Sequence, residues 1–172
     1  MIHLKITSDS LDEIDNDLAL VLTYQDVRPL RGQAGLLDWR LNGYLSQLIL
    51  NHRFQGDLGE ALLMPSQGRV GAKELLILGM GPSGDVGDQN IPNYVSLILE
   101  KLLRKKNKSF CLSLSDLAKG MFEWRNTVRL FMSMLSGKEE NYQISLLEPD
   151  GFVDDARKRH MDFAYDVQVQ YS

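Results

Sequence analysis

The sequence contains a single cysteine, Cys111, and no stretch that approaches the ~20 consecutive apolar residues a membrane helix requires. One cysteine excludes an internal disulfide framework and any zinc site built from several thiolates. Cys111 is flanked by apolar residues within a predicted strand, so we expect a buried, unreactive thiol. The three histidines, His3, His52 and His160, do not stand at metal-ligand spacing. We therefore expect neither a metal nor a cofactor.

An excess of basic charge is also missing. The 19 Lys and Arg residues face 23 Asp and Glu residues, which gives a formal net charge of −4 and argues against nucleic-acid binding. Two local basic runs, 104–108 and 157–160, lie towards the ends of predicted helices, where cations complement the helix dipole. Contact of the 104–108 run with nucleic acid is the alternative. Residues 1–6 do not form a signal peptide, so we expect a cytoplasmic, non-membrane protein.

The length and the 44% hydrophobic content fit one domain covering residues 1–172. Strands are predicted at residues 2–6, 18–24, 60–64, 74–78, 109–114, 142–147 and 165–171, the last at a sheet edge. We expect the first two strands to give some antiparallel pairing. Buried strands alternating with helices predict an α/β fold: a three-layer α/β/α domain with a mixed, mostly parallel sheet.

Four helices are predicted between these strands. The first covers residues 33–52, and a close helix–sheet approach is one explanation of Gly43 inside it. The second has Pro92 in its first turn. The third is expected to be capped by Ser115 or Asp116 and closed by Gly137, and the fourth to be capped by Asp150.

One glycine-rich loop, residues 79–90, is the main candidate for a ligand site. Its start matches G-x-G-x-x-G after a predicted strand, but Pro82 interrupts the motif and helical periodicity begins only after residue 90. We therefore interpret it as a strand-end loop that uses glycine for unusual backbone angles, with contact to a nucleotide or another anion as the alternative. The candidate ligand-binding residues are Gly79, Gly81, Ser83 and Gly84.

The segment before the first helix carries several polar residues. We interpret Arg28, Arg31 and Asp38 as a structural hydrogen-bond cluster that pins this loop, rather than as a binding site. The two tryptophans, Trp39 and Trp124, are expected to pack in the core or between helix and sheet.

Three sequence blocks carry a family resemblance: Arg28–Gly43, Phe54–Glu60 and Leu75–Gly81. Their order resembles the N-terminal domain of the leucyl (cytosol) aminopeptidase family, which implies a macro-like α/β/α fold. The catalytic motifs of that family, Asn-Thr-Asp-Ala-Glu-Gly-Arg and Asp-Thr-Gly-Gly, do not occur. No catalytic or metal-binding residue can be carried over, and we expect the metal-bearing C-terminal domain to be missing.

The resemblance implies a stand-alone, non-catalytic domain that binds a protein partner or associates with itself. The alternative is a macrodomain-type binder of ADP-ribose or a related nucleotide through the Gly79–Asn90 loop.

Overall fold

The computed structural model describes residues 1–104, 106–138, 140–163 and 166–172. The strands are β1 (Ile2–Thr7), β2 (Leu18–Thr23), β3 (Ala61–Pro65), β4 (Glu74–Gly79), β5 (Ser109–Leu112), β6 (Tyr142–Leu147) and β7 (Val167–Tyr171). The helices are α1 (Gly32–Arg40), α2 (Tyr44–Leu50), α3 (Ile91–Arg104), α4 (Met121–Leu135) and α5 (Asp150–Arg159), with a short 3-10 helix η1 (Ser83–Asp85). Within this part of the chain, no helix is both long and apolar enough to cross a membrane.

The strands form one sheet in the order β3-β4-β2-β5-β6-β1-β7, and only the β3–β4 pair is antiparallel. The prediction of a mixed, mostly parallel sheet is confirmed, and β7 is an edge strand as expected; Tyr165, included in that prediction, lies outside the described residues. The expected antiparallel pairing of the first two strands is wrong. β5 and β6 lie between β1 and β2, because the connection 8–17 carries the chain across the sheet.

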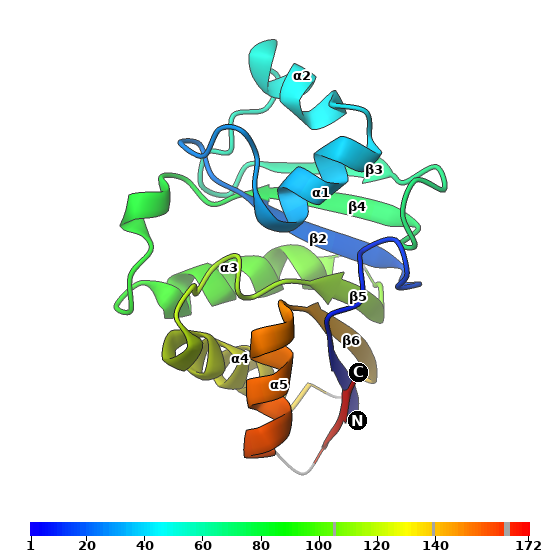
Figure 1. Cartoon of the computed structure of the whole chain (residues 1–172), viewed down its shortest axis with the longest axis vertical. Coiled ribbons are helices and arrows are strands. Elements are labelled where there is room, and N and C mark those ends of the chain that lie inside the picture. The colour runs from blue at the N-terminus through cyan, green and yellow to red at the C-terminus, as the bar shows by residue number, and fades with distance from the viewer. Residues whose placement is uncertain (105, 139, 164–165) are drawn as a thin grey trace.

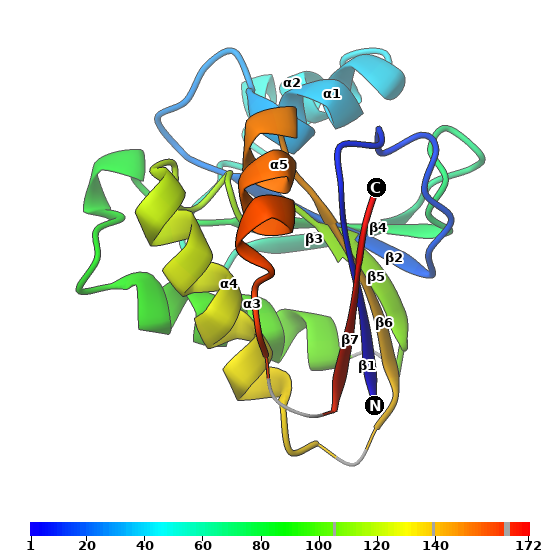
Figure 2. The ribbon, with the colours of Figure 1, turned by 60° about the horizontal axis from the view of Figure 1, so that its bottom comes forward.

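Helices cover both faces of the sheet, which confirms the three-layer arrangement (Figures 1 and 2). The apolar stripes of α3, α4 and α5 pack on one face in the larger hydrophobic cluster. α1 and α2 cover the opposite face at the end of the sheet where β2, β4 and β3 lie. β2 is buried at all six positions because both of its faces are covered.

The helix predicted at residues 33–52 is two helices. The chain leaves α1 through Asn42 and Gly43, whose φ angles of 55° and 78° are left-handed and end a helix. A Cβ at Gly43 would meet no atom within 4 Å, so a close helix–sheet approach is not the reason for this glycine. The break is stabilised by Asp38, whose carboxylate accepts hydrogen bonds from the backbone N–H and the hydroxyl of Ser46 in the first turn of α2.

The predicted helix caps are confirmed only in part. α3 begins at Ile91 with Pro92 in its first turn, and Gly137 follows the end of α4 with a φ of 85°. The N-cap of α4 is Gly120 rather than Ser115 or Asp116, and no side-chain hydrogen bond caps it. Asp150 is the first residue of α5 and makes no capping bond either, since Pro149 is its N-cap.

Candidate functional site

A cleft lies where the carboxyl ends of the parallel strands β2 and β5 meet, the edge at which open α/β sheets tend to bind ligands. Its first cavity has a volume of about 320 Å³ and lies between the loop after β2 and the loop after β5. Leu22, Val27, Leu30 and Ala34 form its apolar lining, and its charged side chains are Arg31, Asp116 and Lys119.

Asp116 is the acid of this cavity. Its Oδ2 atom accepts a 3.0 Å hydrogen bond from the backbone N–H of Gln33, so it caps α1 from a distant part of the chain. Burial raises the pKa of this carboxyl from 3.8 to about 6, while the bond from Gln33 and the charge of Lys119 oppose the rise. The side chains of Arg31 and Lys119 form no ion pair with any residue that the structure describes. They are therefore the two cations that a ligand in this cavity would meet.

A second cavity of about 320 Å³ adjoins the first, with Tyr24 and Lys119 in the lining of both. The Tyr24 hydroxyl donates a 2.7 Å hydrogen bond to the backbone oxygen of Asp116, which holds the two loops together. Burial raises the pKa of this phenol. Because Ser83, Val86 and Gly87 line this second cavity, the glycine-rich loop contributes to the cleft.

The predicted ligand-binding residues lie in different surroundings. Gly79 ends β4, and a Cβ there would overlap the backbone oxygen of Asp57, so its missing side chain permits close packing of two loops. Gly81 has a φ of 73° and packs beside Leu58. Ser83 lines the second cavity, and Gly84 lies in open space, where an added Cβ would meet no atom within 4 Å. Of the four, only Ser83 lines the cleft.

Carboxylates of the chain itself occupy many of the backbone N–H groups around this edge. The Glu60 carboxylate accepts hydrogen bonds of 3.0 to 3.2 Å from the N–H groups of Gln55, Gly56 and Asp57. Asp26 accepts 2.8 and 2.7 Å bonds from the N–H and hydroxyl of Ser83, which hold its pKa below the usual range. Clustered N–H groups of this kind are the ones that bind phosphate in nucleotide sites. Here they are already paired with internal anions.

The buried Glu148 does the same at the end of β6. It accepts bonds of 2.7 and 3.1 Å from the N–H groups of Leu114 and Ser115, and one of 3.1 Å from the Ser113 hydroxyl. Burial raises the pKa of this carboxyl. The predicted strand 109–114 ends two residues early, at Leu112, and the N–H of Leu114 beyond it is paired with the Glu148 side chain.

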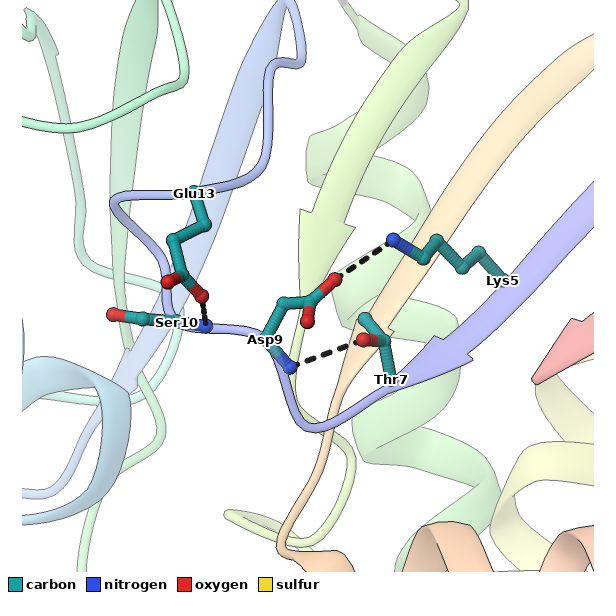
Figure 3. A network of polar contacts seen from close by, with 5 residues as sticks. All are labelled: Lys5, Thr7, Asp9, Ser10 and Glu13. Atoms are coloured by element: carbon teal, nitrogen blue, oxygen red, sulfur yellow. Dashed lines mark hydrogen bonds and ion pairs between the residues drawn. The ribbon is translucent and has the colours of Figure 1, made fainter. Parts of the chain in front are cut away.

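A further polar network closes the turn after β1 (Figure 3). Lys5 Nζ lies 2.8 Å from Asp9 Oδ2, the Asp9 N–H donates to Thr7 Oγ1, and the Ser10 N–H donates to Glu13. The hydrogen bond from Lys5 lowers the pKa of Asp9. Each charged group in this turn has a partner nearby, so the network stabilises the turn.

The polar cluster predicted before α1 does not form as one unit. Arg28 donates to the backbone oxygens of Tyr24, Val27 and Gln55, and it does pin the loop. Asp38 instead caps α2, and Arg31 lines the cleft. Arg31 is thus a site residue that sequence reasoning assigned to structure.

The other residues singled out in the sequence divide between core and surface. Trp124 is fully buried and packs edge-on against Phe152, and Cys111 is buried with its pKa raised to about 12 by desolvation, both as predicted. Trp39 contradicts the prediction because it is 68% exposed, with only the neighbouring Arg40 guanidinium over its ring. It lies on the side of α1 that faces away from the core.

Part of each basic run is engaged in local ion pairs. Arg104 pairs with Glu100 one turn earlier, and Lys108 lies 3.8 Å from Glu140; Lys105 is outside the described residues. In the second run, Arg157 pairs with Asp154 and Arg159 with Asp155. No group of three or more His, Cys, Asp or Glu side chains in the described ranges is arranged to hold a metal ion.

Exposed apolar side chains gather towards one end of the molecule. Seven large hydrophobic side chains of the described residues are exposed, and five of them come from one stretch of chain between residues 39 and 63. α1, α2 and β3, which carry most of them, lie at the same end of the molecule (Figure 1). We call this region the apolar end; its residues are Trp39, Tyr44, Leu50, Leu58 and Leu63, of which Leu63 points to the sheet face opposite α1 and α2. The helix predicted at residues 33–52 gave no sign of this exposure.

Known proteins match the chain over about 70% of its length in sequence and over most of its length in structure. The cytosol aminopeptidase family, N-terminal domain, matches residues 20–140. A probable cytosol aminopeptidase of Alkaliphilus oremlandii is 25% identical over 118 residues, which are 69% of this chain and 24% of the relative. The chain therefore spans about a quarter of the length of such curated relatives.

Solved structures share the fold. A mutant of tomato leucine aminopeptidase matches with a TM-score of 0.60 and 14% identity, over 93% of this chain and 36% of that one. A mutant of the Oceanobacillus iheyensis macrodomain with ADPR matches with a TM-score of 0.59 and 11% identity, over 90% of each chain. The α/β arrangement described above is thus that of macrodomains and of part of a leucine aminopeptidase.

Proposed function

Because the chain belongs to the N-terminal domain family of the cytosol aminopeptidases, we propose that it is a non-catalytic association domain that docks to a second copy of itself. The family match supports the non-catalytic part of the proposal, since the matched domain is the N-terminal one. The names of the curated relatives support a cytoplasmic location.

The apolar end is the observation that carries the proposal. Exposed apolar side chains scattered singly are normal, whereas apolar patches mark protein-interaction sites. Here Trp39 and Leu50 are 68% and 76% exposed on two consecutive helices, and Leu58 is 60% exposed beside them in sequence. Aromatic side chains are also enriched in the energetic centres of interfaces. A surface of this composition gains free energy when a protein covers it.

Sedimentation velocity over a range of protein concentrations tests the association. We expect a reversible increase in mass that is weakened by a Trp39→Lys/Leu50→Lys variant. Phe122→Lys is the matched control, because Phe122 is 64% exposed on α4 and outside the apolar end. If Phe122→Lys weakened self-association equally, the apolar end would have no special role in it.

Hydrolysis of leucyl-anilide in the presence of Mn²⁺ or Zn²⁺ tests the non-catalytic claim. We expect no metal-dependent cleavage by the purified chain. Cleavage that co-elutes with the chain through successive purification steps, after contaminating peptidase is excluded, would overturn it.

A nucleotide ligand in the cleft is the second candidate function, favoured by Arg31 and Lys119 in the lining. Of the predicted loop residues, Ser83 would face such a ligand from the second cavity, whereas Gly79, Gly81 and Gly84 lie outside the lining. The internal carboxylates on the surrounding N–H groups weigh against a phosphate ligand. Calorimetry with ADP-ribose decides it: binding that is lost in Lys119→Ala supports the site, and no heat at millimolar ligand ends the idea.

A further inference from the structure

We infer that two copies of the chain join through their β3 edges, antiparallel about a two-fold axis near Leu63, so that one continuous sheet runs through both copies. This arrangement rests on the proposed self-association and specifies where the two copies meet. β3 pairs with β4 on one side, and no strand of the described residues pairs with its other side. A free edge of this kind is a template for another strand.

The edge lacks the usual protection against such pairing. Native edge strands are commonly guarded by charged side chains, bulges or proline. The β3 sequence, Ala-Leu-Leu-Met-Pro, carries no charge, and its proline is the last residue, so the centre of the strand is unguarded. At the opposite end of the sheet, the exposed side chains of β7 are the polar but uncharged Gln168 and Gln170, whereas those of β3 are the apolar Ala61, Leu63 and Pro65. The apolar side chains favour pairing at β3.

The side chains of β3 suit a two-fold arrangement. Leu63 lies opposite Leu76 in the β3–β4 register, so both point to the same face, and Leu63 is 44% exposed there. Pairing about an axis at Leu63 places the two Leu63 side chains side by side. Leu62 and Met64 point to the other face and are only half-buried in the cluster under α1 and α2. The same pairing would bury the parts of the Leu62 and Met64 side chains that are still exposed.

Charges in the loops that flank β3 favour the antiparallel direction of the pairing. Asp57 lies four residues before β3, where its backbone packs against Gly79 at the end of β4, and Arg69 lies four residues after β3; both are exposed, and neither forms an ion pair with a described residue. An antiparallel pair brings the Asp57 end of one copy to the Arg69 end of the other, and it does so twice. A parallel pair would bring like charges together. The antiparallel two-fold arrangement therefore brings opposite charges together at both ends of the paired strands.

The helices enlarge the contact. Strand pairing of five residues falls well short of the roughly 1,000 Å² that a specific interface buries. A two-fold axis perpendicular to the sheet keeps α1 and α2 of both copies on the same face, and α2 lies at the same end of the molecule as β3 (Figure 1). Tyr44 and Leu50 of α2, 43% and 76% exposed, would then approach their counterparts across the axis.

A charge-swap series read by sedimentation velocity tests the inference. Asp57→Arg and Arg69→Asp should each raise the dimer dissociation constant at least tenfold, and the double variant Asp57→Arg/Arg69→Asp should restore it to within about threefold of the wild type. Leu63→Lys should abolish the dimer, whereas Phe122→Lys should leave it unchanged. Thermal unfolding of each variant confirms that it is folded.

The outcomes separate the two claims. A wild-type dimer that is indifferent to Leu63→Lys, or single charge variants that the double variant does not rescue, would overturn the β3 interface and leave the association proposal standing. A wild-type chain that stays monomeric at every concentration would overturn both.

Discussion

Carboxylates that bind backbone N–H groups are the residue-scale feature of this chain. Glu60, Asp26, Asp116 and Glu148 each close a loop at the carboxyl edge of the sheet, and each comes from a different segment. Hydrogen bonds to charged acceptors are stronger than neutral ones. These acids therefore stabilise the loops and, by the same contacts, take up positions at which an anionic ligand would bind.

The buried Glu148 should be the most sensitive of them to substitution. Glu148→Ala leaves the N–H groups of Leu114 and Ser115 without their acceptor, and an unsatisfied buried group costs about 1–3 kcal/mol. We expect a loss of roughly 2–4 kcal/mol in the free energy of unfolding, measured by urea denaturation. Glu148→Gln should lose less because it keeps one acceptor. Exposed Asp88→Ala is the control, and a similar loss there would contradict the assignment.

Asp116 should make stability depend on pH between about 4 and 6. The pKa of its carboxyl is raised from 3.8 to about 6, so the folded chain keeps this proton over a range in which the unfolded chain releases it. The contribution of Asp116 to stability is therefore highest below pH 3.8, falls as the pH rises to about 6, and is constant above.

The difference in the free energy of unfolding between wild type and Asp116→Asn isolates this effect from other titrating groups. It should decrease from pH 4 to pH 6 and become level at higher pH. A difference that is constant, or that increases with pH, would show that burial does not raise this pKa in the folded chain.

At the scale of elements, glycines act by two mechanisms. Gly43 supplies a left-handed turn between α1 and α2, whereas Gly79 permits close approach of the 56–57 backbone to the end of β4. The sequence did not reveal either mechanism: Gly43 was predicted within a helix, and Gly79 was predicted to serve unusual backbone angles in a strand-end loop, whereas its φ is not positive. The mechanism decides what a substitution does.

Gly79→Ala and Gly84→Ala make a matched pair. A Cβ at Gly79 would overlap the Asp57 backbone oxygen, so we expect a loss of roughly 1–3 kcal/mol from overpacking. Gly84 faces open space, so its substitution should change stability by less than about 0.5 kcal/mol. Urea denaturation compares the two. Equal effects would mean that the loop 56–59 moves aside without cost.

The sequence predicted elements well where periodicity reports burial directly. β2 is a continuous apolar run, and α3 carries a clean stripe of buried residues, so both were placed correctly. The α1–α2 break was missed because the leucine spacing continues across it, while the φ angles of Asn42 and Gly43 depend on local geometry.

The candidate site was less predictable because its parts come together only in three dimensions. Asp116 was expected to cap its own following helix, yet it caps α1, 83 residues earlier in the chain. Lys119 gave no signal at all. The exposure of Trp39 was missed because aromatic residues are more often buried. Which side of α1 faces outward also depends on where the sheet lies, and the sequence does not show that.

At the scale of the whole molecule, the two ends of the sheet differ. The β3 end combines a free edge of apolar exposed side chains with the apolar end, while the exposed side chains of the β7 edge are polar. The cleft lies along a third side, where the parallel strands end. Association through β3 would leave that cleft open, so the two proposed functions are compatible in one molecule.

Self-association is best measured by sedimentation velocity of the wild-type chain across a wide range of concentrations. We expect a reversible shift from one chain of 19.5 kDa towards a species of twice that mass. A sedimentation coefficient that stays that of a single chain at every concentration would show that the chain does not associate.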